Sequence, residues 1–324
     1  FETSVERVDR ATDSWQLTTS RGTILARQVV IATGFDCLPY VRQWPGIESF
    51  GAPVLHSSEY RNAAPFRGRD VLVVGAGSSG TEIALDLAEG GAGRVAIAIR
   101  THPLLLAREW LGIPVSVFSL LARLSMKSVR DVSARLLSRA MFGDLSSYGI
   151  ERSGQPLSEM IARGRLPTVD AGFVDAVRER HIRVVAALER FDGSEVVLAD
   201  GSRLSPDCVI AATAYRGGLE PMLSHLGVVG DDGRPRLDGG PQNSSAPGLY
   251  FVGYRTALTG HLSPIRSDAR HVARAIARQR CRVAPAGRKE EQPPRSPPSE
   301  DAQGDRQRAL EGAPTAVRPG GILA

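Results

Sequence analysis

Residues 70–87 read DVLVVGAGSSGTEIALDL: an apolar run, a glycine turn and a segment with apolar residues at helical spacing. In a Gly-x-Gly-x-x-Gly turn, the first glycine permits the tight turn, the second lets the backbone approach a pyrophosphate, and the third lets the helix pack closely on the strand. The amides at the start of the helix then hold the phosphates. We therefore predict a dinucleotide site at this turn, with a purely structural glycine turn as the alternative. Its residues are Gly75, Ala76, Gly77, Ser78, Ser79 and Gly80.

The following strand indicates which dinucleotide is bound. RVAIAIR, residues 94–100, completes a strand–helix–strand unit of the size that a mononucleotide-binding half requires. An NAD site has a carboxylate at the end of this strand, but here the strand ends in Arg100, Thr101 and His102. A cation and a hydroxyl suit a 2′-phosphate, so we predict NADPH, bound by Arg100 and Thr101. The alternative for Arg100 is a solvated charge at a strand end.

Composition excludes several classes of protein. The chain has 324 residues, 42% of them hydrophobic, with 40 Lys and Arg against 35 Asp and Glu and only 6% aromatic residues, which disfavours nucleic-acid binding. Cys37, Cys208 and Cys281 form neither a disulfide framework nor a metal site, so we expect a cytoplasmic protein without a metal. The longest apolar uncharged run, residues 110–122, is too short to span a bilayer, so no transmembrane segment is expected.

The rest of the chain suggests two similar nucleotide-binding units. Residues 1–35 alternate apolar and polar positions, which predicts antiparallel strands followed by a buried strand. RGTILARQVVIATGF (21–35) is echoed by DGSRLSPDCVIAATAY (200–215). Residues 103–165 are predicted to be helical, and their amphipathic part favours an ordinary packed helix over a membrane-surface helix. A helix is expected to start near Ser263 and Pro264, and the polar, Pro-rich segment 282–324 predicts a disordered tail.

Four motifs in this order resemble the flavin-containing monooxygenases, and within them the indole-pyruvate (YUCCA-type) branch. The motifs are VVIATGF, FGAPVLHSSEY (50–60), FRGRDVLVVGAGSSG and VIAATAY, and the resemblance covers about residues 1–280. It implies an α/β fold of two nested Rossmann-like domains, with an NADPH domain inserted into an FAD domain. The expected boundaries are 1–66 for the first part of the FAD domain, 67–204 for the NADPH domain with a helical insert at 103–165, 205–281 for the second FAD part, and 282–324 for the tail.

The resemblance also implies cofactor-binding residues beyond the glycine turn. Those assigned by position are Ala32, Thr33, Gly34, His56, Tyr60, Thr213, Gly253 and Tyr254. His56 and Tyr60 belong to the identifying motif of the family, although packing in a linker is an equal alternative for both. The helix that begins near Pro264 would point its N-terminus at the flavin.

The chain departs from the family pattern at several positions. Ala52 stands where the identifying motif has Gly, Ser78 replaces an Asn, and Ala214 replaces the Gly of Ala-Thr-Gly-Tyr. The FAD fingerprint would lie before residue 1, so we interpret the chain as N-terminally truncated. We expect the fragment alone to be colourless or weakly yellow and unable to oxidise NADPH with O2, and an upstream extension to restore both colour and activity.

The implied reaction is oxygen transfer from a hydroperoxyflavin, formed from FAD, NADPH and O2, to a small organic substrate. No protein acid or base is demanded, so no catalytic residue is assigned. The alternatives are a Baeyer–Villiger or other two-dinucleotide flavoprotein oxidoreductase, and a truncated, inactive NADP-binding fragment. Disulfide reductases share the two-nucleotide plan but need a redox Cys pair, and no Cys-x-x-Cys is present. The substrate, and whether the protein is a homo-oligomer, are left open by the sequence.

Overall fold

The computed structural model describes residues 2–114, 126–238, 240–257 and 262–283. Residues 1–281 form one compact unit, and 282–324 form a second. The predicted disordered tail lies outside the described residues, apart from the end of the last helix.

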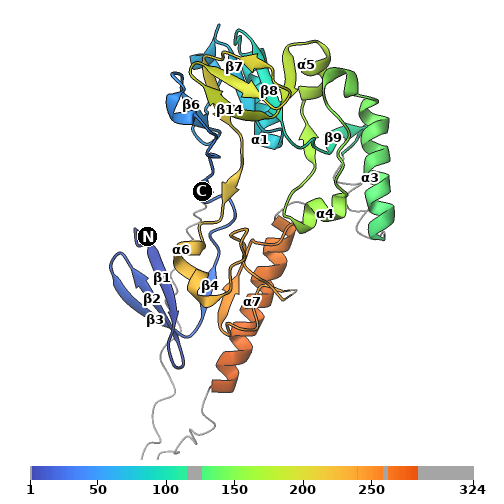
Figure 1. The fold of residues 1–324 in the computed structure, drawn as a ribbon. Helices are drawn as coiled ribbons and strands as arrows, with labels where there is room; N and C mark the ends of the chain where they lie inside the picture. The colour runs from blue at the N-terminus through green and yellow to red at the C-terminus, as the bar shows by residue number, and fades with distance from the viewer. Residues whose placement is uncertain (1, 115–125, 239, 258–261, 284–324) are drawn as a thin grey trace, which may run out of the picture. The chain divides into compact units, whose positions relative to one another are not determined.

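A five-stranded parallel sheet contains the glycine-turn motif. Its strands are β6 (Val54–His56), β7 (Val71–Val74), β8 (Val95–Ile99), β13 (Ile182–Ala186) and β17 (Cys208–Ala211). Their order is β13-β8-β7-β17-β6, and every neighbouring pair is parallel. Strands β6, β7 and β8 are labelled in Figure 1. The strand that precedes the glycine turn therefore lies in the middle of the sheet, as the predicted strand–helix–strand unit requires.

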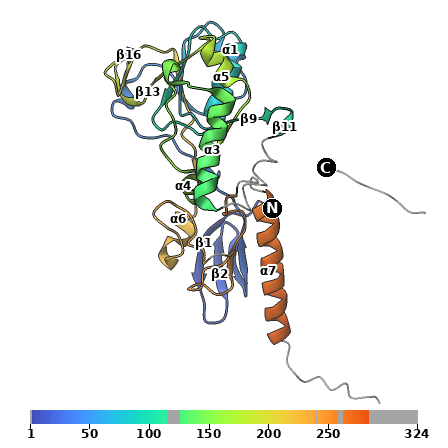
Figure 2. The same cartoon turned by 90° about the vertical axis from the view of Figure 1, so that its right-hand side faces the viewer.

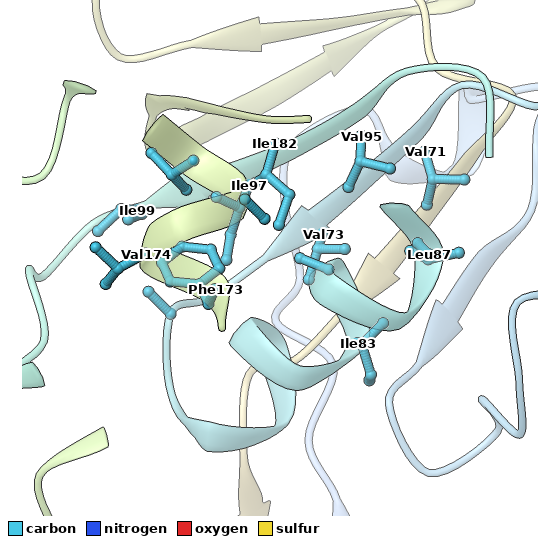
Figure 3. Close-up of a cluster of buried hydrophobic side chains, with 14 of the residues drawn as sticks. Val71, Val73, Ile83, Leu87, Val95, Ile97, Ile99, Phe173, Val174 and Ile182 are labelled. Atoms are coloured by element: carbon cyan, nitrogen blue, oxygen red, sulfur yellow. The ribbon is translucent and has the colours of Figure 1, made fainter. Parts of the chain in front are cut away.

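Apolar residues on both faces explain why β7 reads as an uninterrupted apolar run. Val71 and Val73 point to a core formed with helices α1 (Ser78–Glu89) and α5 (Phe173–Arg178), as Figure 3 shows. Leu72 and Val74 lie in a second core on the opposite face. A strand buried on both faces loses the alternating pattern and becomes continuously hydrophobic.

The second core is closed by a small antiparallel sheet. Its strands are β14 (Leu188–Asp192), β15 (Glu195–Leu198) and β16 (Arg203–Leu204). Phe191 packs there against Phe50, with ring centroids 4.7 Å apart, and Trp44 packs edge-on against the same ring. The segment between β5 (Leu38–Pro39) and β6, which includes η1 (Ile47–Ser49), is therefore anchored on this sheet.

Residues from both ends of the compact unit form a third core. The hairpin strands β1 (Val5–Arg10), β2 (Trp15–Thr19) and β3 (Gly22–Ala26) are antiparallel, as the sequence pattern predicted. Strand β4 (Val29–Ile31) then pairs in parallel with β19 (Leu249–Phe251). The elements that surround or follow this pair are α6 (Glu220–Leu223), η4 (Ser224–Leu226) and α7 (Leu262–Val283).

The chain connects the third core with the five-stranded sheet twice, and the two connecting segments are hydrogen-bonded to each other. Strand β5 follows β4, and β18 (Tyr215–Arg216) follows β17. The two short strands pair antiparallel, with Tyr215 opposite Pro39 and Arg216 opposite Leu38. The Arg216 guanidinium lies over the Tyr40 ring, 4.1 Å from its centroid. All five strands of the parallel sheet thus lie, in the sequence, between the paired strands β5 and β18.

The expectation that residues 103–165 are helical throughout is wrong for the beginning of that segment. Strand β9 (Leu105–Ala107) pairs in parallel with β12 (Thr168–Asp170), and β10 (Glu109–Trp110) forms a hairpin with β11 (Ile113–Pro114). Helices α3 (Lys127–Phe142) and α4 (Leu157–Ala162) follow, while 115–125 lie outside the described residues. Leu104 to Leu106 are buried, and pairing with a distant strand gives this apolar run an extended conformation. Two short helices, η2 (Ala64–Phe66) and η3 (Ser146–Tyr148), complete the mixed α/β fold, which confirms the predicted α/β class.

Candidate functional site

A cleft of about 890 Å³ opens at the carboxyl ends of β7, β8 and β17. Ligands of open parallel sheets bind at this end of the strands. Seven of the residues predicted from the sequence line the cleft: Gly75, Ala76, Gly77, Ser78, Arg100, Thr101 and Thr213. They come from three segments far apart in the chain, and the parallel strands bring them to one edge of the sheet.

The backbone of the glycine turn explains each glycine separately. Gly75 has φ of 113°, and a Cβ there would lie 2.5 Å from the Ala212 carbonyl oxygen. A Cβ on Gly80 would collide with the Gly75 carbonyl oxygen, so the third glycine is what lets α1 begin against the strand. A Cβ on Gly77, by contrast, would meet nothing within 4 Å. The second glycine therefore borders open space in the cleft.

The N-terminus of α1 suits an anion. The helix has no acidic residue in its first turn and no side-chain cap at Gly77. The first-turn amides of a helix have no intrahelical acceptor and carry a partial positive charge. The turn and the helix start thus fit a pyrophosphate, as a dinucleotide would present.

Arginine side chains surround the same cleft. Arg100 is exposed at the end of β8, and among the described residues no carboxylate forms an ion pair with it within 4.0 Å. Its neighbour His102 accepts a hydrogen bond at Nδ1 from the backbone N–H of Glu151, at 3.1 Å. Arg42 and Arg165 also line the cleft. Sequence reasoning missed both, because nothing local marks a residue that only the fold places beside the glycine turn.

Thr213 and Ala214, in the segment after β17, are hydrogen-bonded to Tyr40, in the segment after β5. Thr213 Oγ1 donates to the Tyr40 carbonyl at 2.5 Å, and the Tyr40 N–H donates to the Ala214 carbonyl at 3.2 Å. Ala214 has φ of 72°, in the left-handed region where a glycine is usual. Ala214, which replaces the glycine of the family motif, therefore has a backbone conformation that glycine would adopt without strain.

His56 is buried beside Ala214 and does not line the cleft. It is 2% exposed, and its Nε2 lies 3.0 Å from the Ala214 carbonyl, which can only accept a hydrogen bond. Nδ1 therefore accepts, from the Ser58 N–H at 3.1 Å. The ring also packs edge-on against Tyr215. Both ring nitrogens are engaged by the protein, which favours the packing alternative stated for His56.

Tyr60 lies at the flank of α1. Its hydroxyl donates to Asp86 Oδ2 at 2.5 Å, and its ring stacks on Phe66. Burial, together with the Asp86 carboxylate, raises the pKa of the Tyr60 hydroxyl. Tyr60 is absent from the lining of the cleft, so its contacts attach the segment after β6 to the first helix.

The residues assigned to the flavin gather at the ends of β4 and β19. Thr33 Oγ1 and the Tyr254 hydroxyl are hydrogen-bonded at 2.6 Å, and burial raises the pKa of that hydroxyl. Gly34 and Gly253, with φ of 77° and 89°, turn the chain at the end of each strand. Ala32 follows β4 directly. The parallel pairing of the two strands thus brings together the Thr-Gly and Gly-Tyr motifs, which are far apart in the sequence.

An ion pair with a buried carboxylate, next to these residues, was not predicted from the sequence. Arg255 follows Tyr254, and its guanidinium lies 2.8 Å from Oδ1 of Asp268, a residue of α7 that is 1% exposed. Burial raises the pKa of the Asp268 carboxyl despite the nearby cation. The pair attaches the start of α7 to the end of β19.

Other kinds of site are not found in the described part of the chain. No group of three or more His, Cys, Asp or Glu side chains there could hold a metal ion. Nor do the described helices include one long and apolar enough to cross a bilayer.

Comparisons with known proteins agree with this geometry. A family model described as pyridine nucleotide-disulphide oxidoreductase matches residues 1–110. A probable indole-3-pyruvate monooxygenase of Arabidopsis thaliana, YUCCA7, is 34% identical over 78% of this chain and 58% of its own length. Indole-3-pyruvate monooxygenase YUCCA1 of Oryza sativa is 32% identical over 85% of this chain and 68% of its own length. The chain thus spans about three fifths of the length of the first curated relatives it matches.

Solved structures show the same fold. A flavin monooxygenase from Stenotrophomonas maltophilia, in a mutant form, has a TM-score of 0.60 at 22% identity and covers 86% of this chain and 71% of its own. One solved structure that shares the fold is a complex with FAD and NADP. The glycine turn on a parallel sheet, the paired Thr-Gly and Gly-Tyr motifs and these similarities lead to one assignment: the chain belongs to the flavin monooxygenase family, which uses FAD and NADPH.

Proposed function

We propose that this protein is an FAD- and NADPH-dependent monooxygenase that acts on a small organic substrate. The observation that carries the proposal is the cleft in which Gly75, Gly77 and the N-terminus of α1 face Arg100. Such a cleft offers backbone amides to a pyrophosphate and a guanidinium to a 2′-phosphate. The membership of the chain in the flavin monooxygenase family supports the same function.

In this proposal, NADPH occupies the cleft with its pyrophosphate at residues 75–80. Arg100 and Thr101 bind the 2′-phosphate at the end of β8, and Arg42 and Arg165 add positive charge to the walls. Thr213 lies on the opposite side, where the chain leaves β17. These residues bind and orient the nucleotide, and none of them needs to transfer a proton.

The flavin belongs at the ends of β4 and β19, where Thr33, Gly34, Gly253 and Tyr254 meet. Gly34 supports this placement, since a Cβ there would meet nothing within 4 Å and the backbone is open to a ligand. The chemistry supplied by the two cofactors, when bound, is hydride transfer from NADPH and activation of O2. The role of the protein is to hold the two cofactors close together and to exclude water.

The domain organisation proposed with this function is nested. The proposed ranges are 1–66 and 205–281 for the flavin-binding part and 67–204, inserted between them, for the NADPH-binding part. Strands β6 and β17 lie in the first two ranges but pair in the five-stranded sheet of the NADPH-binding part. The parallel pairing of β4 with β19 supports this division, because these strands flank the five-stranded sheet in the sequence. A cytoplasmic location completes the proposal.

The test measures NADPH consumption and incorporation of ¹⁸O from ¹⁸O₂ into an added substrate, with FAD supplied. Indole-3-pyruvate, which the names of the relatives give as their substrate, is the first compound to try. The 324-residue chain and a version extended upstream in its reading frame are compared. An extended protein that holds FAD but consumes NADPH no faster than free FAD would show that the function is wrong.

A further inference from the structure

A second cavity, of about 390 Å³, lies beside helix α3. It is formed by the C-terminal half of α3, the residues just before β9 and the segment 150–154; Figure 2 shows α3 from the side. It shares only Pro103 and Ser153 with the walls of the cofactor cleft. Its volume is within the range of sites that bind small molecules. Nothing in the proposed reaction uses this cavity.

The floor of the cavity is apolar. Leu104 precedes β9 and Leu105 begins it, Phe142 ends α3, and Leu145 and Ile150 come from the segment that follows α3. All five side chains are buried in the core of the protein. The cavity is therefore a depression in a packed core, and an aromatic ring or a branched aliphatic group would fill it with little loss of protein conformational freedom.

Charged groups stand at its rim. Arg135, Arg139 and Arg152 line the cavity, together with the carboxylates of Asp144 and Glu151. Within the described residues, neither Arg139 nor Arg152 has a carboxylate within 4.0 Å. Arg135 donates to the Gly154 carbonyl at 3.3 Å.

The two carboxylates offset part of this charge, and Asp144 interacts electrostatically with both Arg152 and Arg139. The Ser146 backbone N–H donates to Asp144, and this hydrogen bond lowers the pKa of the Asp144 carboxyl, so Asp144 is ionised at neutral pH. The Glu151 carboxylate lies 3.9 Å from His102 Nε2. Three guanidinium groups against two carboxylates leave an excess of one positive charge at the rim, which suits a ligand with one negative charge.

We propose that this cavity is a second ligand site, for a small organic anion with an aromatic or branched apolar body and a single carboxylate or sulfonate. The apolar body lies on the leucine and phenylalanine floor, and the anion pairs with Arg139 and Arg152. The site is separate from the cofactor cleft, and it can be tested by binding alone, without turnover.

The test is isothermal titration of the 324-residue chain with 2-naphthoate and with 2-naphthamide, its uncharged analogue of nearly the same shape. We expect 2-naphthoate to bind with 1:1 stoichiometry and 2-naphthamide to bind at least 10-fold more weakly, because only the former pairs with the guanidinium groups. The double variant Arg139→Gln/Arg152→Gln should lose that preference. Arg163→Gln, in which the lost arginine is paired with Glu159 on α4 outside the cavity, is the matched control and should bind normally.

A second variant locates the ligand. Gly154 lines the cavity, a Cβ there would meet nothing within 4 Å, and its backbone lacks a positive φ, so Gly154→Phe adds a ring to a lining residue without backbone strain. We expect this variant to keep the wild-type melting temperature and to lose 2-naphthoate binding. Saturating NADP⁺ should leave binding to the wild type in place. Unchanged binding in Gly154→Phe, displacement by NADP⁺, or equal binding of the two naphthalenes would each overturn the proposal.

Discussion

Single residues around the cofactor cleft differ in how far their role depends on local sequence. Arg100 could be singled out because it ends the strand after the glycine turn, where the family of folds binds the adenosine ribose. Arg42 and Arg165 reach the same cleft from a connection and from the segment after α4, and no local pattern marks them. Long-range packing, which a single sequence does not display, decides their position.

Arg100 is expected to select NADPH over NADH. Replacing it with Ala should weaken NADP⁺ binding by about 1.5–3 kcal/mol, or about 10- to 150-fold, the range for hydrogen bonds to charged groups, and should spare NAD⁺. Fluorescence titration of both nucleotides measures this. Arg183→Ala, on the exposed side of neighbouring β13 and outside the cleft, is the control. Equal losses for the two nucleotides would show that Arg100 has a structural role only.

Ala214 carries strain that a glycine would remove. Its φ of 72° costs an L-residue about 1–2 kcal/mol, and the greater freedom of glycine in the unfolded chain offsets part of the gain. We therefore expect Ala214→Gly to raise the free energy of unfolding by about 0.5–1 kcal/mol. Urea denaturation checks this against Ala199→Gly, a surface position without positive φ, which should lose stability. Destabilisation by both changes would contradict the argument.

At the level of elements, the strand–turn–helix unit was predictable and the β9–β12 pair was not. The residues 70–99 form their elements from local pattern, since the strands are apolar on both faces and the turn has its three glycines. The run at 104–106 is equally apolar, but it becomes a strand because its partner, 168–170, lies far along the chain. Periodicity does not distinguish a short buried strand from a buried stretch of helix.

Substitutions at Gly77 and Gly80 should separate the contribution of the turn to nucleotide binding from its contribution to folding. Gly77→Ala adds a methyl group to open space where the pyrophosphate is proposed to lie, so NADP⁺ binding should fall at least 10-fold while the melting temperature hardly changes. Gly80→Ala forces the helix away from the Gly75 carbonyl, and overpacking of this kind costs about 1–3 kcal/mol. Calorimetry and nucleotide titration measure the two effects. A Gly77→Ala variant that binds NADP⁺ with full affinity would show that the pyrophosphate does not lie at this turn.

At the scale of the whole molecule, the residues that line the cofactor cleft come from a restricted part of the chain. Its lining runs from Asp36 to Ala214 and includes no residue of β4, β19 or α7. We therefore expect NADP⁺ to bind with the same affinity, within about 3-fold, whether FAD is present or absent. Titration of flavin-free protein, repeated after addition of FAD, measures this. A requirement for FAD would show that the nucleotide site depends on the β4–β19 region.

The pairing of β5 with β18 has a consequence for how such a protein can arise. Because the chain leaves one region at Leu38–Pro39 and returns at Tyr215–Arg216, directly opposite, the intervening segment has its entry and exit in one place. A gene fragment with adjacent ends can be acquired by a surface loop of a host in a single recombination event, without disturbing the host core. The same geometry would let engineers exchange the whole intervening segment for that of a relative, with two short junctions to adjust.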